Sequence, residues 1–96
     1  MKRRMTLDTF LKALRRTPRT WRVIWGVRLR CRSGGGIYCP IEVVSRMRGG
    51  PSNISDADTF LGLSEQTTYT IMDAADCPSD HTRTRKRLLR ACGLSE

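Results

Sequence analysis

Residues 21–32, WRVIWGVRLRCR, decide the predicted fold, because apolar and basic side chains alternate along them. The odd-numbered positions are apolar: Trp21, Val23, Trp25, Val27, Leu29 and Cys31. The even-numbered positions are mostly basic: Arg22, Ile24, Gly26, Arg28, Arg30 and Arg32. A period of two is typical of a β-strand with one face toward the core and the other toward solvent. We therefore predict a strand that buries both tryptophans and carries a bulge or bend at Gly26.

A turn and a returning strand follow this segment. Ser33 precedes three consecutive glycines, and glycine is a residue that tight turns favour. Residues 37–39, Ile-Tyr-Cys, then resume with side chains that are common in strands. Together the two segments predict a β-hairpin.

Helices are predicted on both sides of the hairpin. Residues 5–16 form the first one, with Thr6 as its N-cap and Pro18 beyond its end. Its apolar residues recur at the spacing of one helical face: Leu7, Phe10, Leu11 and Leu14. The later helices are predicted at residues 56–61, at residues 64–76, and from just after Ser79 or Asp80 to Cys92.

Residues 40–48 fit two structures. Pro40 suits the first position of a helix, whereas Ile41, Val43 and Val44 are β-branched and favour a strand nearly as well. With this point open, we predict an α+β fold in a single domain, residues 1–96. It consists of an N-terminal helix, a β-hairpin, and three or four short helices packed on the sheet.

The charge of the chain is strongly basic and unevenly distributed. Eighteen Lys and Arg residues against nine Asp and Glu give a formal net charge of +9 and a pI near 10.5. Residues 49–82 contain six acidic residues and no Lys or Arg, so the cations gather in the two flanking segments. Such a charge attracts nucleic acid, an anionic membrane or an acidic protein surface. No apolar run approaches 18 residues, so we expect neither a membrane span nor a secretory signal, and a cytoplasmic protein.

Two sets of basic side chains are the candidate binding residues. The first lies on the polar face of the predicted strand: Arg22, Arg28, Arg30 and Arg32. The second follows helical i, i+3, i+4, i+7 spacing on the last helix: Arg83, Lys86, Arg87 and Arg90. A solvated charged face is the alternative, but like charges on one stripe repel, and a bound anion relieves that repulsion. Arg15 and Arg16 fall in the last turn of the first helix, where a capping role explains them as well as binding does.

Residues 61–64, Leu-Gly-Leu-Ser, are typical of the turn in DNA-binding helix-turn-helix units. A recognition helix that began at Ser64 would present Glu65, Asp73 and Asp76, and no cation, to a polyanion. We therefore interpret this region as a structural helical hairpin packed on the sheet.

Metal and catalytic sites are not expected. The candidate metal ligands lack the close spacing of zinc sites: Cys31, Cys39, Cys77, His81 and Cys92. We predict buried thiols, no disulfide, no metal and no cofactor. The single histidine has no nucleophile partner in sequence, and no phosphate-cradling motif occurs, so we expect no enzymatic activity.

Four short motifs resemble small uncharacterised proteins encoded in phages and prophages of Arg-rich, high-GC bacteria. These are residues 39–41 (CPI), 61–64 (LGLS), 74–76 (AAD) and 87–94 (RLLRACGL). The group implies no activity, cofactor or catalytic residue. It implies a phage setting, in which small proteins often bind a host machine stoichiometrically, as anti-CRISPR proteins do. Many of those inhibitors are acidic mimics of DNA, and the net charge of +9 departs from that pattern.

From charge and resemblance together we expect a non-enzymatic phage-type protein that inhibits a host nucleic-acid-handling defence complex through its Arg-rich surface. The partner is a host ribonucleoprotein or nucleic-acid-processing complex in the bacterial cytoplasm, with no membrane involved. The alternative is an accessory or regulatory protein that binds DNA or RNA directly. The oligomeric state stays open.

Overall fold

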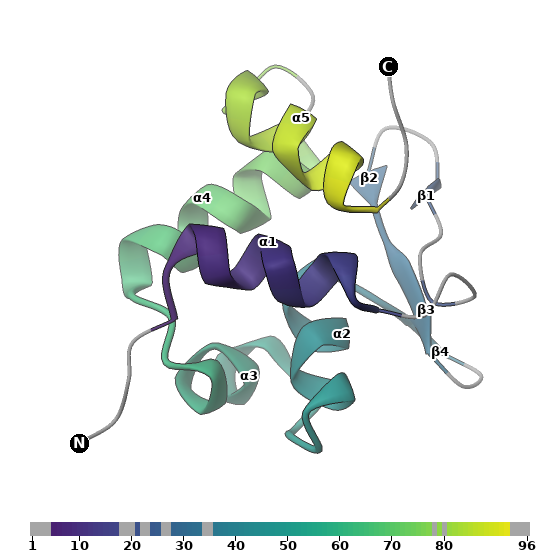
Figure 1. Cartoon of the computed structure of the whole chain (residues 1–96), viewed down its shortest axis with the longest axis vertical. Coiled ribbons are helices and arrows are strands. Elements are labelled where there is room, and N and C mark those ends of the chain that lie inside the picture. The colour runs from purple at the N-terminus through teal and green to yellow at the C-terminus, as the bar shows by residue number, and fades with distance from the viewer. Residues whose placement is uncertain are drawn as a thin grey trace.

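Five helices and four short strands make up the computed structural model, which describes residues 5–17, 21, 24–25, 28–33, 36–77, 79 and 81–92. The helices are α1 (Leu7–Arg15), α2 (Pro40–Met47), α3 (Ile54–Leu61), α4 (Glu65–Asp76) and α5 (Thr82–Ala91). The strands are β1 (Ile24–Trp25), β2 (Arg28–Leu29), β3 (Cys31–Ser33) and β4 (Gly36–Tyr38). In Figure 1, α1 crosses the middle of the view, with α4 and α5 on one side, α2 and α3 on the other, and the strands at one edge.

Local capping signals set the helix boundaries. The side chains of Thr6, Asn53 and Ser64 each accept a hydrogen bond from a backbone N–H three residues later, at 3.0–3.2 Å. Each thereby satisfies one of the free donors at the start of α1, α3 and α4. Gly62 ends α3 with a φ of 76°, a left-handed conformation that glycine adopts without strain. The predicted first helix and the predicted helix at residues 64–76 are confirmed, and α3 begins two residues before its predicted start.

The predicted α+β class is wrong, because the molecule is mostly helical. The single strand predicted over residues 21–32 is broken: β1 pairs antiparallel with β2, Ile24 opposite Leu29 and Trp25 opposite Arg28. This segment therefore folds back on itself instead of extending, and the described strands form two separate two-stranded pairings instead of one sheet covered by the helices. The interruption of the alternation at residue 26 is the sequence feature that indicates this reversal. Gly26 itself lies outside the described residues.

The predicted hairpin around the glycines forms, but only over three residue pairs. In it β3 pairs antiparallel with β4, with Cys31 opposite Tyr38 and Ser33 opposite Gly36. The guanidinium of Arg46 in α2 lies over the ring of Tyr38, 4.8 Å from its centroid. This cation–π contact joins the small hairpin to the helical core.

Residues 40–48, which fitted helix or strand, form helix α2. Pro40 occupies its first turn, and the side chains of Ile41, Val43 and Val44 are completely buried. Helix α2 contacts α1, α3, α4 and both strands of the hairpin. Tertiary burial thus outweighs the small intrinsic preference of β-branched residues for strands.

The core lies between the helices. Its largest fully buried side chains include Phe10, Leu14, Leu29, Ile71 and Leu88. Leu29 and Cys31 are buried as the alternation predicts, and Trp21 is half-buried against the core. The side chain of Trp25, also predicted to be buried, lies outside what the structure describes.

Within the described ranges, no helix is both long and apolar enough to cross a membrane.

Candidate functional site

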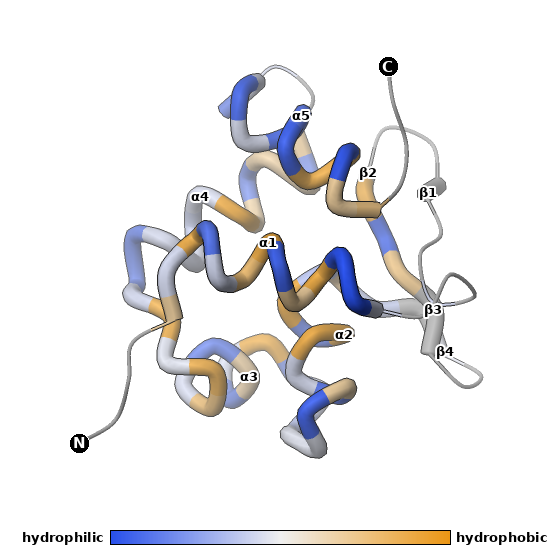
Figure 2. Tube along the Cα trace, in the orientation of Figure 1, coloured by the Kyte–Doolittle hydropathy of each residue, from blue (hydrophilic) through white to orange (hydrophobic). Residues whose placement is uncertain are grey.

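A cationic groove of about 300 Å³ lies between α1 and α5. Its lining consists of four cations, one carboxylate and one apolar side chain: Lys12, Arg15, Arg87, Arg90, Asp8 and Leu11. Figure 2 shows strongly hydrophilic positions at the C-terminal end of α1 and along α5, interrupted in α5 by a hydrophobic stretch. We call this feature the α1–α5 groove.

Helical periodicity explains how each helix supplies its part of the α1–α5 groove. In α1, Leu11 and Leu14 are buried, which leaves Lys12 and Arg15 exposed in the last turn. In α5, Leu88 and Ala91 are buried, which leaves Arg90 exposed. Contact between the two helices then brings the exposed cations to one groove.

Asp8 and Arg87 form an ion pair across the α1–α5 groove, with Nη2 of the arginine donating to Oδ1 of the carboxylate. Both side chains are well exposed, at 73% for Asp8 and 39% for Arg87. A pair of this exposure contributes at most about 1 kcal/mol to folding stability. The pair places a carboxylate beside the Arg87 guanidinium in the groove.

The remaining cations of the α1–α5 groove are uncompensated. Among the described residues, Lys12, Arg15 and Arg90 have no carboxylate partner. Guanidinium groups present planar forks of donors that match phosphate and carboxylate oxygens. The α1–α5 groove is therefore suited to an anion with several acceptor oxygens.

The predicted helical stripe is present on α5. Arg83, Lys86 and Arg90 are exposed, and Arg87 is half-exposed. Only Arg87 and Arg90 line the α1–α5 groove, while Arg83 and Lys86 lie nearer the start of the helix.

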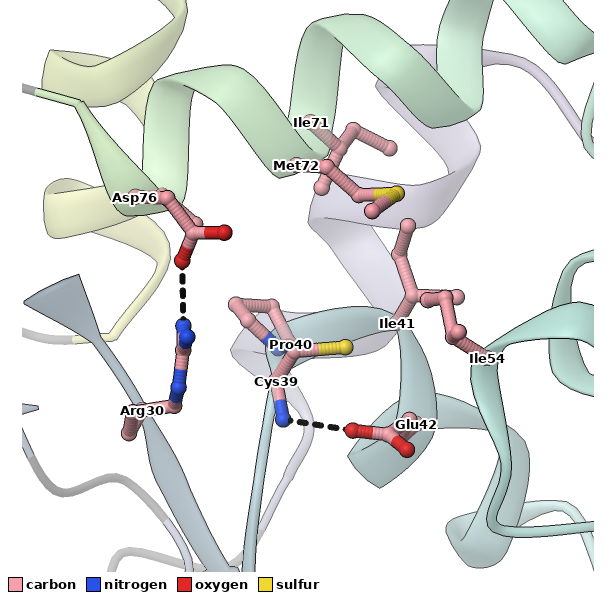
Figure 3. Close-up of a pocket in the computed structure, with 10 residues that line it drawn as sticks. Arg30, Cys39, Pro40, Ile41, Glu42, Ile54, Ile71, Met72 and Asp76 are labelled. Atoms are coloured by element: carbon pink, nitrogen blue, oxygen red, sulfur yellow. Dashed lines mark hydrogen bonds and ion pairs between the residues drawn. The ribbon is translucent and has the colours of Figure 1, made fainter.

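Of the predicted strand set, the structure describes the side chain of Arg30 alone. Arg30 is 23% exposed, and its Nη1 donates to Oδ1 of Asp76 at 2.6 Å and to the carbonyl oxygen of Leu29 at 3.0 Å. Figure 3 shows this side chain directed at Asp76. Arg28 and Arg32 are described by their backbone alone, and Arg22 lies outside the described residues. What the structure does show is that Arg30 serves an internal contact.

Sequence reasoning missed Lys12 altogether and left Arg15 open between a capping role and binding. The signal available was the spacing of these two residues on the exposed face of α1. The two residues lie in one groove with cations of α5 only because α1 packs against α5. A local sequence pattern does not predict that packing.

Arg85 is a structural cation on the same helix as the stripe. Its Nη1 donates to the carbonyl oxygens of Ala74 at 2.9 Å and Ala75 at 3.3 Å, in the last turn of α4. A cation there satisfies free carbonyls and offsets the negative end of the helix dipole. The acidic helix α4 and the basic helix α5 are thus tied together within one chain.

A second, apolar pocket of about 160 Å³ lies where β4 leads into α2 (Figure 3). Its apolar lining includes Ile41, Ile54, Ile71 and Met72. Cys39 also lines this pocket, and burial raises the pKa of its thiol to about 12. Because thiolate is the nucleophilic form, this cysteine is unreactive at neutral pH.

The four cysteines are free thiols. Cys31 and Cys92 are buried as predicted, whereas Cys39 and Cys77 are half-buried. A hydrogen bond with the Cys92 side chain, together with burial, raises the pKa of Cys31 far above its usual range. Within the described part of the chain, no group of three His, Cys, Asp or Glu side chains has the geometry to hold a metal ion.

No protein-family model, curated protein or solved structure matches this chain.

Proposed function

We propose that this protein is a non-enzymatic binding protein that engages an anionic partner through the α1–α5 groove. The partner class that fits its charge and its phage-type resemblance is a host nucleic-acid-handling defence complex, which the protein inhibits stoichiometrically. The observation that supports the proposal is the convergence of four cations on one groove with a single opposing carboxylate.

Phosphate is the anion that this groove suits best. Three of its four cations are arginines, whose forked donors bind phosphate oxygens in pairs. Nucleic acid exposed in the target complex presents such phosphates in a row.

Binding to nucleic acid at several salt concentrations tests the proposal. Fluorescent single-stranded DNA, duplex DNA and RNA are titrated with the protein, and the slope of log affinity against log salt is measured. Each phosphate neutralised adds about −0.7 to −0.9 to that slope, so a groove of four cations predicts a slope of roughly −3. The double variant Lys12→Glu, Arg90→Glu is expected to abolish this binding.

A matched control separates the α1–α5 groove from general charge. Arg83→Glu, Lys86→Glu makes the same charge change on exposed positions outside the groove. If it weakens binding as much as the groove variant, the whole α5 stripe binds and the groove has no special role. If neither variant changes binding, the basic surface is solvated only.

A functional assay then distinguishes inhibition from simple binding. Cleavage or binding activity of a purified host ribonucleoprotein defence complex is measured with increasing protein. Inhibition that saturates near one protein per complex, and is lost in Lys12→Glu, Arg90→Glu, supports the inhibitor. Binding to free nucleic acid without inhibition instead supports the alternative, an accessory DNA- or RNA-binding protein.

A further inference from the structure

A third groove, of about 390 Å³, lies between α3 and α4. Its lining combines apolar, hydroxyl and acidic side chains: Ile54, Ser55, Asp58, Glu65, Thr68, Tyr69 and Met72. We call it the α3–α4 groove. It shares no residue with the α1–α5 groove, so it is a separate surface.

The α3–α4 groove has an exposed apolar part. Tyr69 is 57% exposed, one of the two large exposed hydrophobic side chains in the described chain. Ile54 and Met72 also line the neighbouring 160 Å³ pocket, so the two hollows adjoin along these side chains. Methionine is flexible and polarisable, and it adapts readily to a bound apolar group.

The charge of the α3–α4 groove is opposite to that of the protein as a whole. Asp58 and Glu65 are its ionisable acids, and residues 49–82 supply no Lys or Arg to neutralise them. Among the described residues neither carboxylate forms an ion pair, although Asp8, Asp73 and Asp76 each lie against a basic side chain. Within the described part of the chain these two acids are therefore not neutralised by a cation, and they lie beside an apolar surface.

A buried hydroxyl in the wall of the α3–α4 groove also lacks a partner. Thr68 is only 6% exposed, and its Oγ1 forms no hydrogen bond with any described atom. Buried polar atoms are nearly always paired, so the wall of this groove is incompletely satisfied by the described chain.

We propose that the α3–α4 groove docks a basic, amphipathic segment of a partner protein. An apolar side chain of that segment packs on Ile54 and Met72. A neighbouring Lys or Arg lies between Asp58 and Glu65 and over the ring of Tyr69, where a cation–π contact adds to the ion pairs. Charge complementarity favours this occupant, because the two carboxylates repel an acidic segment. A purely polar segment would leave the apolar surface of the groove exposed to water.

The test uses three labelled peptides and the full-length protein. The first peptide is a helical repeat of Leu and Lys, the second replaces Lys by Glu, and the third replaces Leu by Ser. Fluorescence anisotropy is expected to show binding of the first peptide and not of the third. The acidic peptide is measured with the Lys12→Glu, Arg90→Glu variant, because the intact α1–α5 groove attracts it, and no binding is expected there. Equal binding of the acidic and basic peptides to that variant, or no binding of the basic amphipathic one, overturns the proposal.

Three variants of α4 locate the binding. Glu65→Gln removes a carboxylate that lines the α3–α4 groove, and Asp73→Asn removes an exposed one that does not. We expect Glu65→Gln to weaken peptide binding about fivefold, the upper range for one exposed ion pair, with no change for Asp73→Asn. Met72→Ala is expected to weaken it about tenfold. Equal losses in Glu65→Gln and Asp73→Asn place the peptide elsewhere and overturn the proposal.

Sedimentation of the free protein tests the competing occupant, a second copy of this chain. If the protein dimerises and Glu65→Gln dissociates the dimer, the groove is a self-association surface and the proposed partner segment is wrong. A monomer that still binds the basic peptide supports the proposal. Because the α1–α5 groove carries the proposed function, loss of nucleic-acid binding in Lys12→Glu, Arg90→Glu leaves these outcomes unaffected.

Discussion

Arg30 and Asp76 are 46 residues apart in sequence, yet Nη1 of the arginine lies 2.6 Å from Oδ1 of the aspartate. The contact fastens the link between β2 and β3 to the C-terminal end of α4. It also leaves the Arg30 side chain only 23% exposed, so this cation, predicted to bind a partner, makes an internal contact as well. The acidic middle of the chain is thus balanced in part by the basic segment that precedes it.

The Arg30–Asp76 pair is expected to contribute about 1 kcal/mol to stability, since both side chains are partly exposed and solvent screens them. A double-mutant cycle with Arg30→Ala and Asp76→Asn, measured by urea unfolding, isolates this coupling energy. Neither change is expected to affect nucleic-acid binding. If the coupling energy is zero and Arg30→Ala weakens nucleic-acid binding, Arg30 is a binding residue, as the sequence predicts.

Two buried hydroxyls predict opposite responses to removal. Oγ of the fully buried Ser45 donates to the carbonyl oxygen of Pro51 at 2.6 Å, whereas Oγ1 of Thr68 has no partner among the described atoms. Ser45→Ala is expected to cost about 1–2 kcal/mol, because it leaves an acceptor unpaired. Thr68→Val keeps the shape and removes an unpaired polar atom, so it should be neutral or stabilising. Chemical denaturation measures the free energy of unfolding of both variants. A decrease of more than about 1 kcal/mol in Thr68→Val would show that the Thr68 hydroxyl has a partner.

The buried thiols predict a loss of stability in alkali. Burial raises the pKa of Cys39 to about 12, while a thiol in the unfolded chain ionises near pH 8.5. Between these values the unfolded state releases a proton that the folded state retains, so stability is constant below about pH 8 and falls above it. The slope is about 1.4 kcal/mol per pH unit for each such thiol, and Cys31 acts in the same direction.

Cys39→Ser isolates this effect, because serine does not titrate there and is a favoured N-cap residue for α2. Urea unfolding between pH 7 and pH 10 is expected to give parallel curves up to about pH 8. Above that the variant should lose less stability, by about 1.4 kcal/mol near pH 9.5. Curves that stay parallel throughout would show that Cys39 is exposed to solvent.

Local patterns predicted the helices well and the strands poorly, for a physical reason. Thr6, Ser64 and Gly62 act within their own helix ends, so spacing and capping chemistry located those ends. The alternation over residues 21–32 indicates two faces but not whether the segment stays extended, and the pairing of Ile24 with Leu29 depends on a reversal inside it. The basic stripe on α5 was readable from periodicity. That Lys12 and Arg15 lie in the same groove as part of this stripe could not be predicted, because their placement depends on how α1 packs on α5.

Asp8 is the one carboxylate lining the α1–α5 groove, and it competes with any anionic ligand for Arg87. Asp8→Asn is therefore expected to strengthen binding to single-stranded DNA about two- to fivefold, the range for one exposed ion pair, and to make its salt dependence steeper. The variant also loses a favourable acid in the first turn of α1, at a cost of about 0.3–1 kcal/mol. Asp56→Asn is the matched control, because it removes an acid from the first turn of α3, outside the groove. If Asp8→Asn weakens DNA binding while Asp56→Asn has no effect, Asp8 positions Arg87 for the ligand and does not compete with it.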